Sequence, residues 1–160
     1  HMYRDIAAHN IGTITHVGLY TFADPRNGGG KLNDVTKEDL VKVVEIEGQE
    51  RLLYKAFPIN VVFLRASYAD EYGNCTVHRE IGPIDVTAMA QACKNSGGKV
   101  IVQVEKIVQG GSLDPKLVAI PGIYVDSVVV GTEEENMQCL GMPYDGALTG
   151  EFRIPHISGF

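Results

Sequence analysis

Apolar residues occur along this chain in short runs, and the continuous runs predict β-strands. The runs at residues 61–64 (VVFL) and 100–104 (VIVQV) are too short to be helices. Between them, apolar residues recur at the helical spacing i, i+3, i+4, i+7, at Val86, Met89, Ala90 and Cys93. The order strand, helix, strand predicts a βαβ unit from Val61 to Val104 with a right-handed crossover.

Continuous apolar runs are typical of parallel strands that are covered on both faces. A further run at residues 124–130 predicts another buried strand. We therefore expect an α/β fold with a mainly parallel sheet and flanking helices. The residues expected to be buried are Val61, Phe63, Met89, Ile101, Val104 and Val128.

Outside this unit the pattern predicts a β-hairpin and two helix starts. The extended runs at residues 42–46 and 51–56 are joined by the segment 47–50 (EGQE), and a glycine between β-rich runs is typical of a hairpin. Thr36 is a candidate N-cap for a helix of about two turns. Asp85 is a candidate N-cap for the helix of the βαβ unit.

The loss of periodicity beyond Thr132 divides the chain into unequal parts. Residues 1–2 (His-Met) are typical of an expression scar, and residues 3–131 are expected to form the α/β domain. The Gly- and Pro-rich residues 132–160 are expected to be a linker or arm. A chain of 160 residues is large enough for one buried core.

Composition and charge narrow the range of partners. The net charge is −6, from 20 acidic and 14 scattered basic residues, which argues against nucleic acid binding. No apolar run approaches the ~20 residues of a membrane helix, and no signal peptide is visible, so no membrane partner is expected. Cys75, Cys93 and Cys139 are odd in number and lack CxxC spacing, which favours a reducing cytoplasm and argues against a metal site.

The segment from Gly18 to Asn33 (GLYTFADPRNGGGKLN) is the most unusual part of the sequence. Three consecutive glycines follow a D-P-R turn, and they can take backbone angles that other residues avoid. They indicate that something approaches the backbone closely. A P-loop is not expected, because Pro25 and Leu32 stand where that motif has glycine and Ser or Thr. A mobile surface loop is the alternative.

No residue of this chain is assigned as catalytic. No pair suggests a Ser-His-Asp or Cys-His arrangement, and a carboxylate nucleophile needs an exposed position beside preorganised hydrogen-bond donors. Glu47, in the predicted hairpin, and Glu80, at a strand end, are interpreted as solvated surface. Glu105 lacks a glycine-rich turn that would expose it.

Several blocks of the chain resemble, in order, the family I coenzyme A transferases, in particular the acetate or propionate type. Gly18–Asn33 resembles that family's G-x-G-T-F-V-D-P-R-x-x-G-G-K-L-N block. Residues 69–74 (ADEYGN) resemble its A-D-x-x-G-N turn, and residues 90–105 resemble A-Q-A-V-K-N-x-G-G-x-V-I-x-Q-V-E. The remaining matches are residues 52–58, 61–66, 113–115 and 120–126. Tyr20 departs from the block, which usually has a second glycine there, and is expected to crowd the loop.

This resemblance implies a CoA-transferase (NagB/RpiA-like) half-domain, covering the later part of the first α/β half and the linker. In that family a glutamate of the second half attacks an acyl-CoA and then forms a glutamyl-CoA thioester. The implied substrates are a short-chain acyl-CoA and a carboxylic acid such as acetate, as in short-chain fatty acid and ketone body metabolism, with no bound cofactor. The block that carries the glutamate is absent here, so the resemblance implies an inactive piece that needs the missing C-terminal half, within a homo-oligomeric parent.

The resemblance also places the glycine block after a strand that ends near the family's active site. The expected substrate-binding residues are Gly18, Thr21, Asp24, Arg26, Gly28, Gly29, Gly30 and Lys31. Exposed glycine N–H groups would meet an acyl or phosphate oxygen, and Lys31 would add a positive charge. Two other functions remain open: a non-catalytic α/β binding or regulatory module, and a subunit that completes a site with a separate chain.

Overall fold

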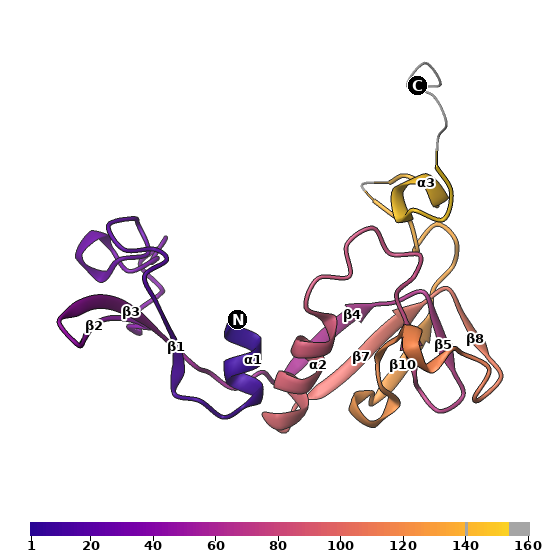
Figure 1. Cartoon of the computed structure of the whole chain (residues 1–160), viewed down its shortest axis with the longest axis horizontal. Helices are drawn as coiled ribbons and strands as arrows, with labels where there is room; N and C mark the ends of the chain where they lie inside the picture. Colours follow the sequence, from indigo (N-terminus) through magenta and orange to yellow (C-terminus); the bar gives the residue numbers. More distant parts are fainter. Residues whose placement is uncertain (140, 154–160) are drawn as a thin grey trace, which may run out of the picture.

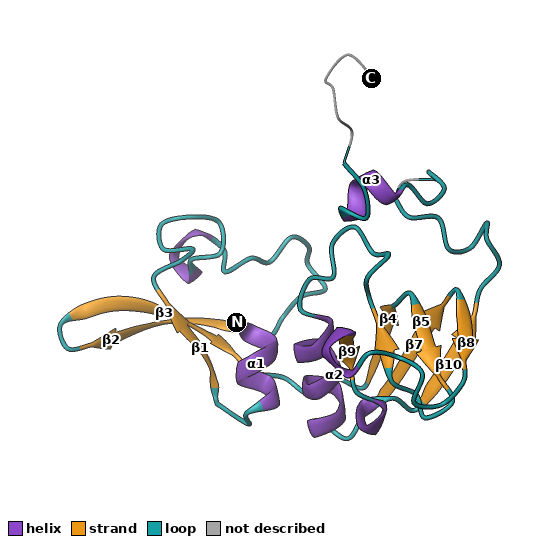
Figure 2. Cartoon of the chain, turned by 45° about the vertical axis from the view of Figure 1, so that its right-hand side comes forward, coloured by secondary structure: helices purple, strands orange, loops and turns teal. Residues whose placement is uncertain are grey.

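The computed structural model describes residues 1–139 and 141–153. Two groups of elements follow one another along the long axis of the molecule (Figure 1). An antiparallel sheet contains the N-terminal strands, and a parallel sheet with its helix forms the other group. Figure 2 shows the antiparallel hairpin extending away from the rest of the chain.

The parallel sheet has the strand order β10-β7-β4. It is formed by β4 (Val61–Arg65), β7 (Lys99–Val104) and β10 (Ser127–Val130). Helix α2 (Val86–Asn95) lies in the connection from β4 to β7, and these two strands pair in parallel. The predicted βαβ unit and the α/β fold class with a parallel sheet are therefore confirmed. The last strand begins three residues later than the apolar run at residues 124–130 predicts.

A second sheet, with the order β8-β5-β6-β9, continues from the parallel one. Strands β5 (Tyr68–Asp70) and β8 (Lys106–Val108) follow β4 and β7 almost directly and pair in parallel with each other. Strands β6 (Cys75–Thr76) and β9 (Val118–Ile120) complete it in antiparallel fashion. The short 3₁₀ helices are η1 (Pro25–Asn27), η2 (Pro115–Leu117) and η3 (Gly122–Tyr124), and α3 is Gly146–Thr149.

The N-terminal sheet has the order β1-β3-β2. Strands β2 (Val41–Ile46) and β3 (Gln49–Lys55) form the predicted hairpin, and β1 (Gly12–Thr15) pairs with β3. Glu47 and Gly48 have φ values of +50° and +72°, and a two-residue turn with both values positive matches the twist of a hairpin. Helix α1 (Met2–Ala7) packs against α2.

The helix predicted after Thr36 is absent, and that expectation is wrong. The Asn33 side-chain oxygen accepts hydrogen bonds from the N–H groups of Val35 and Thr36 and from the Thr36 hydroxyl. These bonds close a local turn over residues 33–36, and the chain runs on from it into β2 instead of into a helix. Asp85 does occupy the N-cap position of α2, but its φ is +53° and its side chain forms no capping hydrogen bond.

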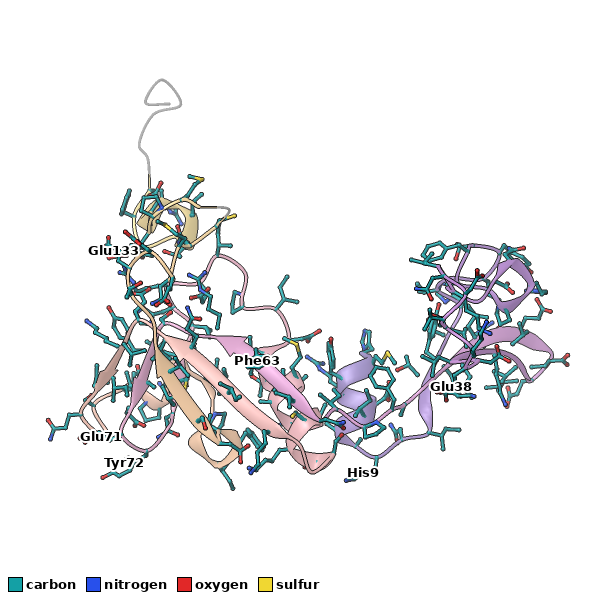
Figure 3. All side chains as sticks on the ribbon, turned by 180° about the vertical axis from the view of Figure 1, so that it is seen from behind. His9, Glu38, Phe63, Glu71, Tyr72 and Glu133 are labelled. Carbon is teal, nitrogen blue, oxygen red and sulfur yellow. The ribbon has the colours of Figure 1, made fainter. Side chains whose placement is uncertain are left out.

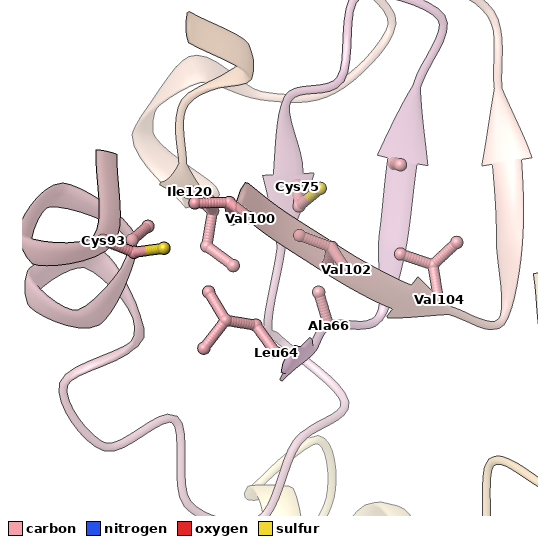
Figure 4. Packing of buried hydrophobic residues seen from close by; sticks show 10 residues of the cluster. Leu64, Ala66, Cys75, Cys93, Val100, Val102, Val104 and Ile120 are labelled. Carbon is pink, nitrogen blue, oxygen red and sulfur yellow. The ribbon is translucent and has the colours of Figure 1, made fainter. Parts of the chain in front are cut away.

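The hydrophobic core lies between α2 and one face of the parallel sheet (Figure 4). Val100, Val102 and Val104 alternate along β7 and are fully buried, and Leu64 on β4 is 5 % exposed. Cys93 reaches this core from α2. The buried residues of β4 and β7 therefore lie on the face of the sheet that packs against α2.

The expected burial of β4 on both faces is wrong for this chain. Val104 is buried as predicted. Three other residues that were expected to be buried are only partly buried: Met89, Ile101 and Val128. Phe63, however, is 77 % exposed and Val61 is 47 % exposed. These two residues point away from α2, and no element of the described residues covers that face of the sheet.

No helix in residues 1–139 and 141–153 is both long and apolar enough to cross a membrane.

Candidate functional site

Asp24 organises the loop that contains all the predicted binding residues. Its side chain is fully buried and accepts N–H hydrogen bonds from Tyr20 at 2.9 Å and from Arg26 at 3.0 Å. The Arg26 guanidinium donates two more, from Nε at 3.0 Å and from Nη2 at 2.8 Å. The Arg26 side chain and these N–H groups hold the pKa of Asp24 well below its usual range. Asp24 and Arg26 therefore shape the loop, and neither carboxylate oxygen is available to a ligand.

The glycines adopt the backbone that their sequence predicts. Gly28, Gly29 and Gly30 have φ values of +109°, +63° and +75°, which residues with a Cβ avoid. A Cβ added at Gly28 or Gly30 would meet nothing within 4 Å, so the space beside them is open. The loop is thus both strictly glycine-dependent in conformation and accessible from outside.

The N–H groups of these glycines are not free, and that part of the expectation is wrong. Gly29 N–H donates to the Asp24 carbonyl at 3.0 Å and Gly30 N–H donates to the Phe22 carbonyl at 2.8 Å. Gly28 and Lys31 also donate within the loop. The Lys31 ammonium forms an ion pair with Asp39. A ligand oxygen would have to displace these bonds, so the loop offers shape and access more than hydrogen-bond donors.

Tyr20 explains why the resembling family has glycine at this position. Its φ is +64°, a left-handed conformation that costs a residue with a Cβ roughly 1–2 kcal/mol. The expectation that Tyr20 crowds the loop is wrong, because its side chain points outward and is 74 % exposed. Its ring lies 5.2 Å from the Arg26 guanidinium carbon.

The outside of the loop is apolar. Large side chains project into solvent from this segment and its surroundings, with exposures of 64–87 %: Val17, Tyr20, Phe22, Leu32 and Val35. Gatherings of exposed apolar side chains are typical of surfaces that contact a partner or a ligand. The internally bonded loop therefore supports an apolar contact surface.

A second cluster lies at the carboxyl ends of the parallel strands, and the sequence did not predict it. Arg65, the last residue of β4, pairs with Glu80 at 3.4 Å, and Arg79 pairs with Glu105, the residue after β7, at 3.0 Å. The interpretation of Glu80 as solvated surface is wrong, because its side chain is only 12 % exposed. Burial raises the pKa of Glu80, and Arg65 opposes that shift.

This cluster borders a small polar pocket of about 260 Å³. The Arg79 guanidinium lies 3.4 Å above the Tyr144 ring, and Lys106 and Glu133 also line the pocket. Open α/β sheets bind ligands beyond the carboxyl ends of their strands, so this position is the one that the fold favours for a site. The partners are 15 and 26 residues apart in sequence, which is why no local motif could have revealed them.

The two regions lie at opposite ends of the long axis (Figures 1 and 3). The structure brings the eight predicted binding residues together in one loop, but it does not bring that loop to the carboxyl-end cluster. No group of three or more His, Cys, Asp or Glu side chains suited to a metal ion occurs in the part of the chain that the structure describes.

Comparison with known proteins shows which family this chain belongs to. Residues 6–131 match the family model described as coenzyme A transferase. The chain is 51 % identical over 156 residues to the caffeate CoA-transferase of Acetobacterium woodii, which covers 96 % of this chain and 30 % of that protein. It is 44 % identical over 151 residues to the acetate CoA-transferase YdiF of Escherichia coli K12, covering 94 % of this chain and 28 % of that protein.

A solved structure agrees with these relatives. The crystal structure of the acyl-CoA transferase YdiF of Escherichia coli O157:H7, as a thioester complex with CoA, matches with a TM-score of 0.89 at 42 % identity. The match covers 98 % of this chain and 30 % of that one. The chain therefore spans about a third or less of the length of these relatives.

Proposed function

This chain belongs to the coenzyme A transferase family, and we propose that it forms part of an enzyme that moves coenzyme A between a short-chain acyl-CoA and a carboxylic acid such as acetate. The observation that carries the proposal is the match to the CoA-bound acyl-CoA transferase over 98 % of this chain. Acyl-CoA is a substrate in this proposal, and no bound cofactor takes part. The enzyme is proposed to work in the cytoplasm, in short-chain fatty acid or ketone body metabolism.

The nucleophile of this reaction is proposed to come from outside the chain. Glu80 and Glu105 are each engaged in an ion pair with an arginine, Arg65 and Arg79, which a nucleophilic attack by either carboxylate would have to break. An acyl-glutamyl intermediate also needs free donors for its oxyanion, whereas the glycine N–H groups donate within their own loop. The isolated chain is therefore expected to be inactive and to need the rest of a longer protein, which is proposed to assemble as a homo-oligomer.

The glycine loop is proposed to border the substrate cleft of the complete enzyme. Its proposed binding residues remain Gly18, Thr21, Asp24, Arg26, Gly28, Gly29, Gly30 and Lys31. The open space beside Gly28 and Gly30 and the exposed apolar side chains around them support this role. Within the loop, Asp24 and Arg26 act by shaping the backbone, and the glycines act by letting a ligand or the second half of the enzyme approach.

The test is a chimera in which this chain replaces its matching segment in YdiF of Escherichia coli. Exchange of labelled acetate with acetyl-CoA is measured for the chimera and for the isolated 160-residue chain. We expect exchange by the chimera and none by the isolated chain. A folded chimera without exchange would favour a non-catalytic module, and exchange by the isolated chain would contradict the missing nucleophile.

The loop has a matched control elsewhere in the chain. Gly30 and Gly111 have φ values of +75° and +77°, and a Cβ at either meets nothing within 4 Å. Gly30→Val and Gly111→Val therefore introduce the same backbone strain at two places. We expect Gly30→Val to lower kcat/KM of the chimera at least tenfold and Gly111→Val to change it less than twofold. Equal effects would remove the loop from the site.

A further inference from the structure

Tyr20 stands at a position where the backbone favours glycine. Its φ is +64°, in the left-handed region that residues with a Cβ rarely adopt, and its side chain is 74 % exposed. The ring therefore gains little from burial while its backbone is strained. Strained residues persist where their surroundings hold them in place, and they gather at functional sites. Folding alone gives no reason for a tyrosine at this position.

Contacts with the loop and the hairpin give Tyr20 a defined position. Its N–H donates to the buried Asp24 carboxylate at 2.9 Å, and its carbonyl accepts from the Asn27 side-chain amide at 3.1 Å. The ring lies 5.2 Å from the Arg26 guanidinium carbon, within the range of a cation–π contact. The hydroxyl donates a long hydrogen bond of 3.4 Å to Glu50 on β3. The ring is thus held by Arg26 on its face and by Glu50 at its tip.

The glycines lie across the loop from Tyr20. Asn27, whose amide contacts the Tyr20 carbonyl, directly precedes Gly28, and Gly30 N–H donates to the Phe22 carbonyl at 2.8 Å. Residues 20–22 are therefore joined to residues 27–30. A Cβ at Gly28 or Gly30 would meet nothing within 4 Å. The loop presents an open side at the glycines and a bulky side at Tyr20.

The charges around the ring favour an uncharged ligand group. The charged groups that hold this part of the loop are the Arg26 guanidinium and the carboxylates of Asp24 and Glu50, which together leave one net negative charge. A phosphate of coenzyme A or a second carboxylate would be repelled there. An alkyl chain carries no charge and suits the exposed apolar side chain of Phe22 nearby. The ring is therefore suited to face the acyl end of an acyl-CoA.

We propose that Tyr20 limits the size of the acyl group that the complete enzyme accepts, with its phenol ring as a fixed wall that admits acetyl and excludes a chain several carbons longer. The proposal rests on the proposed function in taking the glycine loop as a border of the substrate cleft. One extra methylene group in a closely fitting apolar site changes kcat/KM by ~10–200-fold. Tyr20 acts by exclusion and takes no part in the transfer itself.

The experiment compares acetyl-CoA and hexanoyl-CoA as CoA donors for the YdiF chimera. Hexanoyl-CoA and labelled acetate give hexanoate and labelled acetyl-CoA, so one thioester bond breaks as another forms. The quantity measured is the ratio of kcat/KM for hexanoyl-CoA to kcat/KM for acetyl-CoA, in the chimera and in its Tyr20→Gly and Tyr20→Phe variants. Tyr72→Ala is the matched control, because Tyr72 is a tyrosine with 73 % exposure between β5 and β6.

We expect Tyr20→Gly to raise this ratio at least tenfold, because it removes the ring and suits the left-handed backbone. Tyr20→Phe keeps the ring and should leave the ratio within twofold, as should Tyr72→Ala. An unchanged ratio in Tyr20→Gly would place the ring outside the acyl site, and a lower ratio would mean that the ring binds the longer chain. Either result would overturn the proposal, and so would an equal rise in Tyr20→Phe or Tyr72→Ala.

A binding measurement separates this proposal from the proposed activity. S-ethyl-CoA and S-hexyl-CoA are thioethers that cannot transfer coenzyme A, and calorimetry gives their dissociation constants. We expect Tyr20→Gly to tighten the binding of S-hexyl-CoA relative to S-ethyl-CoA at least fivefold. A chimera that shows this shift without any exchange would fail the proposed activity alone. Exchange without the shift, or binding of neither thioether, would overturn the role of Tyr20.

Discussion

Replacing Phe63 and Leu64 separately by alanine tests whether the two faces of β4 differ as the structure shows. These neighbours lie on opposite faces, and their exposures are 77 % and 5 %. A buried Leu→Ala change costs about 3 kcal/mol, including the cavity that it leaves. A fully buried Phe→Ala change would cost about 3–5 kcal/mol, but roughly three quarters of the Phe63 side chain is already in water, so about 1 kcal/mol or less remains.

The assay is urea unfolding of the 160-residue chain, followed by far-UV circular dichroism at pH 7 and 25 °C. With a slope of about 2 kcal/mol per molar urea, Leu64→Ala should lower the midpoint by about 1.5 M and Phe63→Ala by at most about 0.5 M. Measurement at two protein concentrations detects any dimer formed through the face of the sheet opposite α2. Equal midpoint shifts for the two variants would refute the single-sided core.

Three further predictions concern single sites. The pKa of Asp24 lies below its usual value, so the stabilisation from its pair with Arg26 is present above the unfolded pKa of ~3.9. This stabilisation is lost as pH falls through the folded pKa. Amide hydrogen exchange of the loop, measured at pH 6, 4 and 2.5, checks this. Burial raises the pKa of Cys75 to about 12, so a thiol reagent at pH 8 should leave it unmodified until urea unfolds the chain, as mass spectrometry would show. Gly98→Ala should lower the free energy of unfolding by more than ~2 kcal/mol in the urea assay, because the added Cβ would lie 2.3 Å from the Ile59 carbonyl oxygen. The Cβ of Gly97→Ala would meet no atom within 4 Å, so this change should cost only ~1–2 kcal/mol for its φ of +76°. A smaller loss for Gly98→Ala than for Gly97→Ala would contradict the close packing.

Local signals were sufficient for the βαβ unit and the hairpin. The helical spacing from Val86 to Cys93 and the apolar runs on either side depend on the immediate sequence alone. The turn at Gly48 likewise needs only two residues with positive φ. The helix predicted at Thr36 is absent; the Asn33 side chain closes a local turn there, and the chain continues from it into β2.

Long-range relations could not be predicted in the same way. The pairing of Arg65 with Glu80 depends on how the chain returns to the sheet after β6, and no spacing in the sequence encodes it. The exposure of Phe63 depends on which elements pack on each face of the sheet, and a continuous apolar run cannot reveal that one face stays exposed. The residues of the predicted binding loop lie in one structural unit, but the hydrogen bonds that engage its glycine N–H groups depend on how the backbone folds and could not be predicted from the sequence.

In the loop around Asp24, the groups that hold the backbone are different from the side chains that form the surface. Its conformation is held by backbone hydrogen bonds, by the buried carboxylate and by positive-φ glycines, none of which involves the outward side chains of Phe22 and Leu32. A surface built in this way is ordered before anything touches it, so association loses little conformational entropy there. Substitutions at Phe22 or Leu32 therefore change the apolar surface of the loop while the hydrogen bonds that hold its backbone stay in place.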